Sequence, residues 1–124
     1  MISVDVIFRE DEVEVAAAGH AGYAPHGRDI VCAGVSALLY GCYDYLRCLT
    51  QRRHGARTVK SEQDGAIWFK AERCAPDARI AVETTLAGLC LVENDFGEYV
   101  RVNVTDLTSM TNTEEGDHGK RDDA

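Results

Sequence analysis

Long apolar runs are absent from this sequence. No stretch approaches the ~18 consecutive apolar residues that a membrane-spanning helix needs, although 45% of the 124 residues are hydrophobic. The first residues, MISVDVIFRED, contain neither a basic leader nor a cleavable apolar segment. We therefore expect no membrane segment and a cytoplasmic location. A chain of this length and apolar content suits one compact domain.

Paired cysteine motifs are also missing. The number of cysteines is odd, and no two of them form a CxxC pair: they are Cys32, Cys42, Cys48, Cys74 and Cys90. This spacing argues against a disulfide framework and against a zinc ribbon. We expect free thiols in a reducing compartment, and neither a bound metal nor another cofactor.

Basic clusters are scarce. Lys and Arg together number 13 against 21 Asp and Glu, which gives a net charge of −8 at pH 7. A nucleic-acid surface needs clustered Lys and Arg side chains to contact phosphates, so we expect no direct binding of nucleic acid. An acidic surface suits a basic peptide partner instead.

Two hydrophobic periodicities divide the chain into strands and helices. Alternation predicts a hairpin over residues 2–18, a second hairpin over 58–71 and a last strand near 100–105. Spacing of three and four residues predicts helices over 30–51 and from Pro76 to about residue 94. The stripe of the first helix that faces the core is predicted to hold Val31, Val35, Leu38, Cys42, either Tyr45 or Leu46, and Leu49.

The resulting order of elements is ββ-α-ββ-α-β. It predicts an α+β fold with two layers, an antiparallel sheet with two helices packed on one face. We assign this domain to residues 1–109. The other face of such a sheet is partly uncovered, and self-association commonly buries exposed area of that kind, so we expect a homodimer. Residues 110–124 are acidic and poor in large apolar side chains, and we expect them to form a disordered tail.

The segment before the first helix carries the candidate chemistry. With Asp29 as the N-cap, Cys32 lies in the first helical turn, where unpaired N–H groups and the helix dipole favour a thiolate nucleophile. His20 lies upstream on a glycine-rich loop from which it can reach this sulfur, so the two residues form a candidate Cys-His dyad. Backbone N–H groups at the helix start are candidate donors to an oxyanion. Asp29 either caps the helix or orients His20, and Ser36 either lines the cleft or bonds back to a helix carbonyl.

The loop that carries His20 is itself a candidate functional element. Gly19, Gly22 and Gly27 either shape a turn or form a hinge that lets the loop close over a peptide. We expect this loop to be disordered or held open in the free protein. His20 would then come within hydrogen-bond reach of Cys32 only when a peptide is bound.

The same residues carry a family resemblance. Gly19-His20-Ala21, Gly27 and the run DIVCAGVSA over residues 29–37 are similar to the signature of the bacterial ribosomal-processing cysteine proteases, the Prp family. This resemblance implies an endopeptidase that removes the N-terminal extension of a large-subunit ribosomal protein precursor during ribosome maturation. It also implies catalytic roles for His20 and Cys32, and a homodimer.

Other interpretations stay open from the sequence. Cys32 could be a small core residue, and His20, His26 and Cys32 could ligate a metal, although their spacing matches no common zinc pattern. The chain could be a non-catalytic ribosome-associated or peptide-binding module. A thiol redox protein is disfavoured because Cys42, the nearest second thiol in the sequence, lies about 15 Å along the helix at ~1.5 Å per residue.

Overall fold

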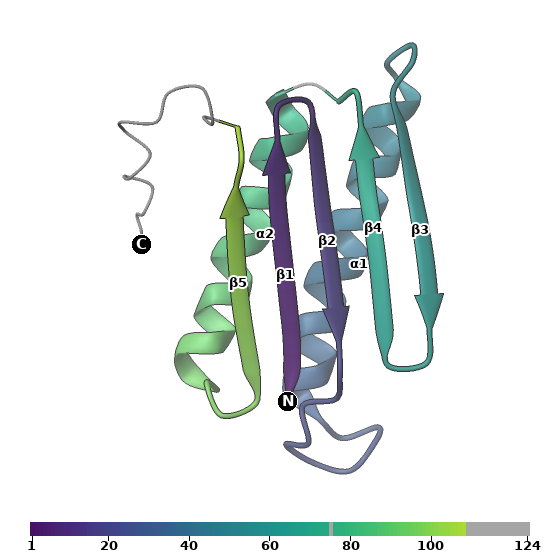
Figure 1. The fold of residues 1–124 in the computed structure, drawn as a ribbon. Helices are drawn as coiled ribbons and strands as arrows, with labels where there is room; N and C mark the ends of the chain where they lie inside the picture. The colour runs from purple at the N-terminus through teal and green to yellow at the C-terminus, as the bar shows by residue number, and fades with distance from the viewer. Residues whose placement is uncertain (75, 109–124) are drawn as a thin grey trace, which may run out of the picture.

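The computed structural model describes residues 1–74 and 76–108 of the chain. This part of the chain forms strands and helices in the predicted order (Figure 1). The elements are β1 (Ile2–Arg9), β2 (Glu12–Ala18), α1 (Ile30–Gln51), β3 (Arg57–Gln63), β4 (Ala66–Glu72), α2 (Pro76–Asp95) and β5 (Val100–Asp106). The predicted tail over residues 110–124 lies outside the described residues.

The strands form a single mixed sheet in the order β3-β4-β2-β1-β5. All neighbouring pairs are antiparallel except β1 and β5, which are parallel. The prediction of an antiparallel sheet is therefore wrong for the last strand. The reason is the connection through α2, which returns the chain along the sheet so that β5 runs in the direction of β4 and hence of β1.

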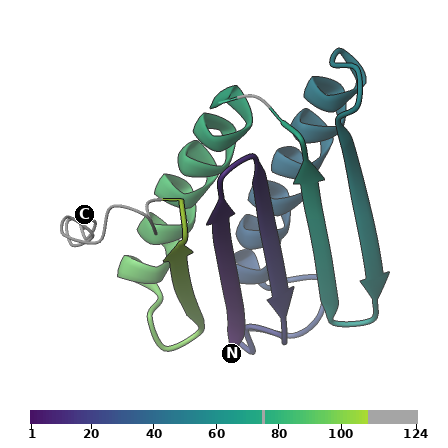
Figure 2. The same cartoon turned by 45° about the horizontal axis from the view of Figure 1, so that its top comes forward.

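Both helices cover the same face of the sheet, so the predicted α+β class with two layers is confirmed (Figure 2). Alternate side chains of the strands point toward the helices, as the period of two requires. Val4, Val6 and Phe69 are at most 1% exposed, and they form the centre of the core together with Leu46 and Leu89 of the helices.

The first helix packs against both the sheet and α2, and this changes the predicted core stripe. Leu39 is buried against the core, whereas Leu38 is only half-buried and lies at the contact between the helices. There a Cβ added to Gly88 would come within 2.8 Å of Leu38 Cδ2, so α2 approaches α1 closely at a residue without a side chain. A helix with two partners buries a wider stripe than the sequence spacing alone suggests.

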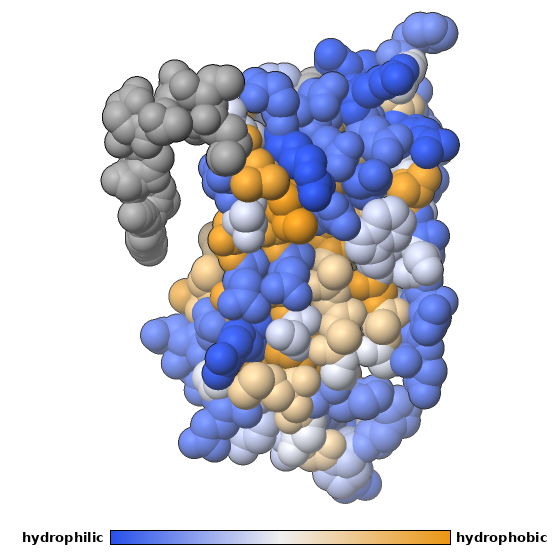
Figure 3. Space-filling view, viewed as in Figure 1, coloured by the Kyte–Doolittle hydropathy of each residue, from blue (hydrophilic) through white to orange (hydrophobic). Residues whose placement is uncertain are grey.

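The active-site candidates come together at one end of the sheet. There β2 ends, α1 begins and the turn between β3 and β4 lies nearby (Figure 1). The opposite face of the sheet is uncovered, and Figure 3 shows apolar side chains in the middle of it with hydrophilic ones around them. Neither of the two described helices is long and apolar enough to cross a membrane.

Candidate active site

Gly19 fixes the start of the loop that carries His20. Its φ is +102°, and an added Cβ would lie 2.2 Å from the Met1 carbonyl oxygen, so only glycine fits this position. The Gly19 N–H donates to the Gly65 carbonyl at 2.8 Å. The backbone beside His20 is therefore attached both to the start of β1 and to the β3–β4 turn.

The rest of the loop is attached to the domain at several points. Ala21 is only 4% exposed, and the Tyr23 ring packs edge-on against Phe96 and Tyr99, with ring centroids 5.5 Å and 5.2 Å apart. The N–H groups of Tyr23 and Ala24 donate to Asp29 Oδ2 at 2.9 Å and 3.2 Å. These contacts attach the loop to the domain and to the start of α1.

Asp29 is the N-cap of α1, as the sequence predicts. Its backbone is extended, with φ −86° and ψ 102°, and its Oδ1 accepts the Cys32 N–H at 2.9 Å. Because both carboxylate oxygens accept backbone N–H groups, led by that of Cys32, the pKa of Asp29 lies below its usual range. Within the described residues Asp29 makes no hydrogen bond to His20. Its hydrogen bonds join the loop to the start of α1.

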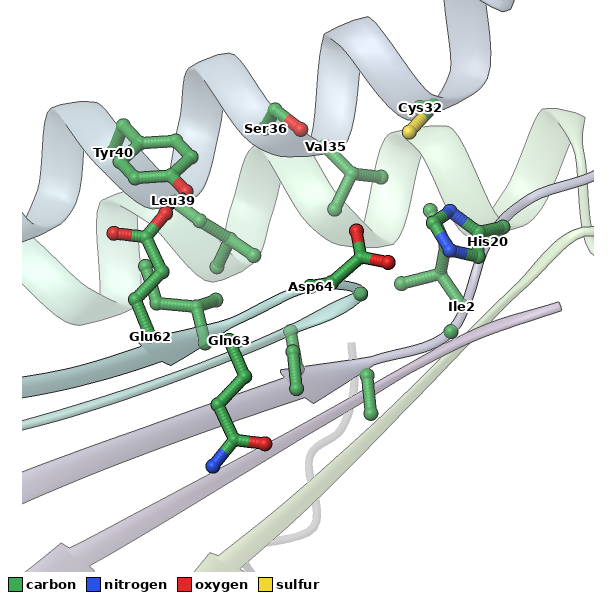
Figure 4. Close-up of a pocket in the computed structure, with 16 residues that line it drawn as sticks. Ile2, His20, Cys32, Val35, Ser36, Leu39, Tyr40, Glu62, Gln63 and Asp64 are labelled. Atoms are coloured by element: carbon green, nitrogen blue, oxygen red, sulfur yellow. Dashed lines mark hydrogen bonds between the residues drawn. The ribbon is translucent and has the colours of Figure 1, made fainter. Parts of the chain in front are cut away.

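Cys32 and His20 lie on opposite walls of one pocket. Cys32 is half-buried in the first turn of α1, and His20 is exposed at the start of the loop. Both line a pocket of about 540 Å³, and Figure 4 shows both side chains directed into it. No hydrogen bond joins them in the part of the chain that the structure describes.

The same pair also lines a second hollow. This hollow, of about 550 Å³, lies on the loop side and is lined by Gly22, His26 and Gly27 as well as His20 and Cys32. Gly22 and Gly27 have φ values of +71° and +91°, with open space where a side chain would stand, so they shape turns without close contacts. Ser36 lines both hollows, one helical turn after Cys32.

The remaining walls of the first pocket combine an apolar floor with an acidic rim. The floor includes Ile2, Val35 and Leu39, and the rim carries Glu62 and Asp64 from β3 and the β3–β4 turn. On this rim the Tyr40 O–H donates to the Glu62 carboxylate.

That hydrogen bond changes the acidity of both groups. It raises the pKa of Tyr40 and lowers the pKa of Glu62. At neutral pH the Glu62 carboxylate is therefore ionised and already accepts a hydrogen bond from Tyr40.

Three other cysteines, Cys42, Cys74 and Cys90, are less suited to nucleophilic chemistry than Cys32. Cys42 is 5% exposed, and burial raises the pKa of its thiol. Burial also raises the pKa of Cys74 and of Cys90, which favours their protonated forms. None of these three thiols lines the pocket that holds His20 and Cys32. Across residues 1–74 and 76–108, no three His, Cys, Asp or Glu side chains gather in a group that could hold a metal ion.

Sequence reasoning missed the contribution of the β3–β4 hairpin. Asp64-Gly65 is recognisable as a turn, but nothing local shows that this turn lies against His20. Tyr40 and Glu62 were likewise not distinguished from ordinary surface residues. The predicted hairpin was the one signal in the sequence that the turn between these two strands could lie near the loop.

Comparisons with known proteins show which family this chain resembles. A family model described as cysteine protease Prp matches residues 1–101. The ribosomal processing cysteine protease Prp of Staphylococcus aureus is 29% identical over 107 residues, which cover 83% of this chain and 98% of that protein. The Bacillus subtilis protein of the same name is 32% identical over 91 residues, which cover 68% of this chain and 78% of that protein.

A solved structure extends the likeness to the fold. It is the crystal structure of the Staphylococcus aureus protease Prp in complex with a covalently linked product peptide. It matches with a TM-score of 0.71 and 29% identity, over 85% of this chain and 100% of that one. The chain described here therefore belongs to the Prp family of cysteine proteases.

Proposed function

We propose that Cys32 is the nucleophile and His20 the base of a cysteine endopeptidase. The observation that supports this most is that the two residues line both hollows, one on each side of them. An endopeptidase must bind its substrate on both sides of the scissile bond, and two hollows that meet at the dyad provide that room.

The chemistry follows from the two side chains. His20 takes the proton of the Cys32 thiol, and the thiolate attacks the carbonyl carbon of the scissile bond. The resulting tetrahedral intermediate collapses to an acyl-enzyme as His20 protonates the leaving amine. Water then attacks the thioester, with His20 again as base, and releases the second product together with the free thiol.

Two of the backbone N–H groups that the sequence suggests as oxyanion donors already have acceptors. The N–H of Cys32 donates to the Asp29 side chain at 2.9 Å, and the N–H of Ala33 donates to the Asp29 carbonyl at 3.0 Å. Both groups are thus occupied. We assign one oxyanion contact to the Ser36 hydroxyl, which lines both hollows and has no hydrogen-bond partner among the residues drawn with it in Figure 4.

The proposed substrate is the N-terminal extension of a large-subunit ribosomal protein precursor. The relatives from Staphylococcus aureus and Bacillus subtilis are named for ribosomal processing, and solved structures of the former include one with a substrate peptide. The acidic rim at Glu62 and Asp64, with the net charge of −8, suits the basic sequences of ribosomal proteins. Such a substrate is made in the cytoplasm, where we place the enzyme, and the enzyme recognises protein and not nucleic acid.

We further propose that the enzyme is a homodimer. The uncovered face of the sheet holds a hollow of about 300 Å³, lined by small side chains such as Ala16, Ala18 and Ala66 next to Trp68. A second copy that covered this face would remove its apolar side chains from water. Sedimentation velocity at micromolar concentration tests this, and a monomer under those conditions contradicts it.

The proposed reaction is tested by incubating the protein with the ribosomal protein precursor and measuring product masses. We expect one cleavage near the precursor N-terminus, and none with Cys32→Ala or His20→Ala. Cys48→Ser and Cys90→Ser serve as controls, because they remove one other thiol from α1 and one from α2 and should leave cleavage intact. Full cleavage by a purified Cys32→Ala protein would exclude the proposed mechanism, and tight binding without cleavage by the unmodified protein would indicate a peptide-binding module.

A further inference from the structure

Three carboxylates surround the proposed dyad, and two of them are occupied. Asp29 accepts backbone N–H groups on both of its oxygens. Glu62 accepts the Tyr40 hydroxyl and lies 3.4 Å from the Lys60 ammonium. Asp64 also lines the pocket, and in the described part of the chain no hydrogen bond or ion pair engages its carboxylate.

The backbone holds Asp64 next to His20. Gly65, with a φ of +76°, completes the two-residue turn that Asp64 begins, and its carbonyl accepts the Gly19 N–H at 2.8 Å. The turn also lies close to the imidazole, because a Cβ added to Gly65 would be 3.1 Å from His20 Nε2. The hydrogen bond from Gly19 to Gly65 therefore holds the turn beside the residue that precedes His20.

The orientation of the side chains agrees with that placement. His20 Nε2 is the ring atom nearest to Gly65, so this edge of the imidazole faces the turn and Nδ1 lies on another edge. In Figure 4 the Asp64 carboxylate points into the pocket toward His20, and the Cys32 sulfur points into the same pocket from α1. Rotation of the Asp64 side chain changes the distance between its carboxylate and the imidazole, and the backbone of the turn need not move.

We propose that Asp64 is a positioning residue that orients His20, which extends the proposed dyad to a Cys-His-Asp arrangement. When a peptide fills the cleft, the Asp64 carboxylate accepts a hydrogen bond from the imidazole N–H that faces the turn. This contact fixes the ring with its other nitrogen toward Cys32, and it stabilises the imidazolium that forms when His20 takes the thiol proton. Asp64 stays ionised throughout, because the proton moves from sulfur to His20 and then to the leaving amine.

This inference depends on the proposed dyad, and its consequences differ from those of a merely acidic rim. Removing a carboxylate that orients the base lowers kcat and shifts the pH profile, because the imidazolium loses its stabilising charge. Removing a carboxylate that only attracts a basic peptide raises KM and leaves the pH dependence of kcat alone. The two roles can therefore be separated on one substrate.

Asp64→Asn is the appropriate variant, since Asn-Gly is also a favoured two-residue turn and the hairpin should be kept. We expect kcat to fall on the order of tenfold or more, with KM nearly unchanged. The limb of the pH profile that reports the imidazolium should move to lower pH, because the variant lacks the negative charge beside the ring. Asp64→Glu should recover part of kcat and most of the pH profile, as a longer carboxylate still reaches the ring.

Glu62→Gln is the matched control, because it removes a charge from the same rim where the carboxylate is already occupied by Tyr40. It should change KM at most, with no shift of the pH profile. The proposal is overturned if Asp64→Asn keeps the unmodified kcat and pH profile, or if it raises KM only and does so just as Glu62→Gln does. Loss of cleavage in Cys32→Ala alongside either result would show that the dyad stands and that only the role of Asp64 fails.

Discussion

Gly19 offers the sharpest test of how the loop positions His20. In Gly19→Ala the new Cβ would lie 2.2 Å from the Met1 carbonyl oxygen, in a residue whose φ is +102°. Neither side of this contact can move freely. The Ile2 N–H donates to Tyr99 on one side, and the Gly19 N–H donates to Gly65 on the other, each at 2.8 Å.

Two costs add up for this substitution. Holding alanine at such a φ costs about 1–3 kcal/mol, and relieving the clash breaks one backbone hydrogen bond worth about 1 kcal/mol. The free energy of unfolding should therefore fall by about 2–4 kcal/mol, which lowers Tm by roughly 10 °C in a domain of this size. Gly22→Ala is the matched control, since its φ is +71° and nothing lies within 4 Å of the added Cβ, so that it should cost only about 1 kcal/mol.

The assay is urea unfolding of both variants, followed by peptide cleavage at a temperature where each is fully folded. Gly19→Ala should lose most of kcat/KM even when folded, because the shifted backbone carries His20 away from Gly65. Gly22→Ala should keep most of its activity. Equal destabilisation by the two substitutions would refute the argument that the close approach of Gly19 to Met1 fixes the position of the loop.

Three further predictions concern other parts of the chain. The hydrogen bond from Arg79 holds the pKa of Asp106 at about 2, so its contribution to stability is present above about pH 4 and is lost as the pH falls through 2. Asp106 is 43% exposed, so Asp106→Asn should cost about 1 kcal/mol in urea unfolding at pH 7, and a cost that persists unchanged at pH 2 would contradict this. Truncation after Thr111 removes an acidic segment poor in large apolar residues, so Tm should stay within about two degrees and peptide turnover should be kept, whereas a large drop in Tm would show that the segment packs on the domain. Hydrogen exchange over residues 19–28 should slow when an uncleavable peptide binds, and equal protection with and without peptide would argue against closure of the loop on the dyad.

The sequence predicts those parts of the fold whose causes are local. Asp29 as an N-cap depends on residues within one helical turn, and the Asp64-Gly65 turn depends on two residues. The strands follow from alternation in single segments. These features hold whatever the strands pair with, and the structure confirms each of them.

The features that were missed depend on which segments become neighbours. The parallel pairing of β5 with β1 follows from the passage through α2, and no pattern within residues 100–106 distinguishes it from antiparallel pairing. The burial of Leu39 in place of Leu38 depends on the approach of α2 at Gly88. A single sequence gives the faces of an element but not the partner that each face meets.

The same reasoning explains why the surroundings of His20 were only partly predicted. Cys32 follows His20 after one short loop, so their proximity can be argued from the sequence. The Asp64-Gly65 turn, in contrast, lies beside His20 only because β4 pairs with β2. In that register Ala18 lies opposite Ala66, which brings the next residue, Gly19, to the turn at Gly65. A slip of one residue would turn the buried face of β4 toward solvent, so the packing of the core fixes the register that places Asp64 at the pocket. The hydrophobic pattern of β4 thus determines which residues of the β3–β4 turn line the pocket beside His20. It does so through the pairing of β4 with β2, which only the folded chain shows.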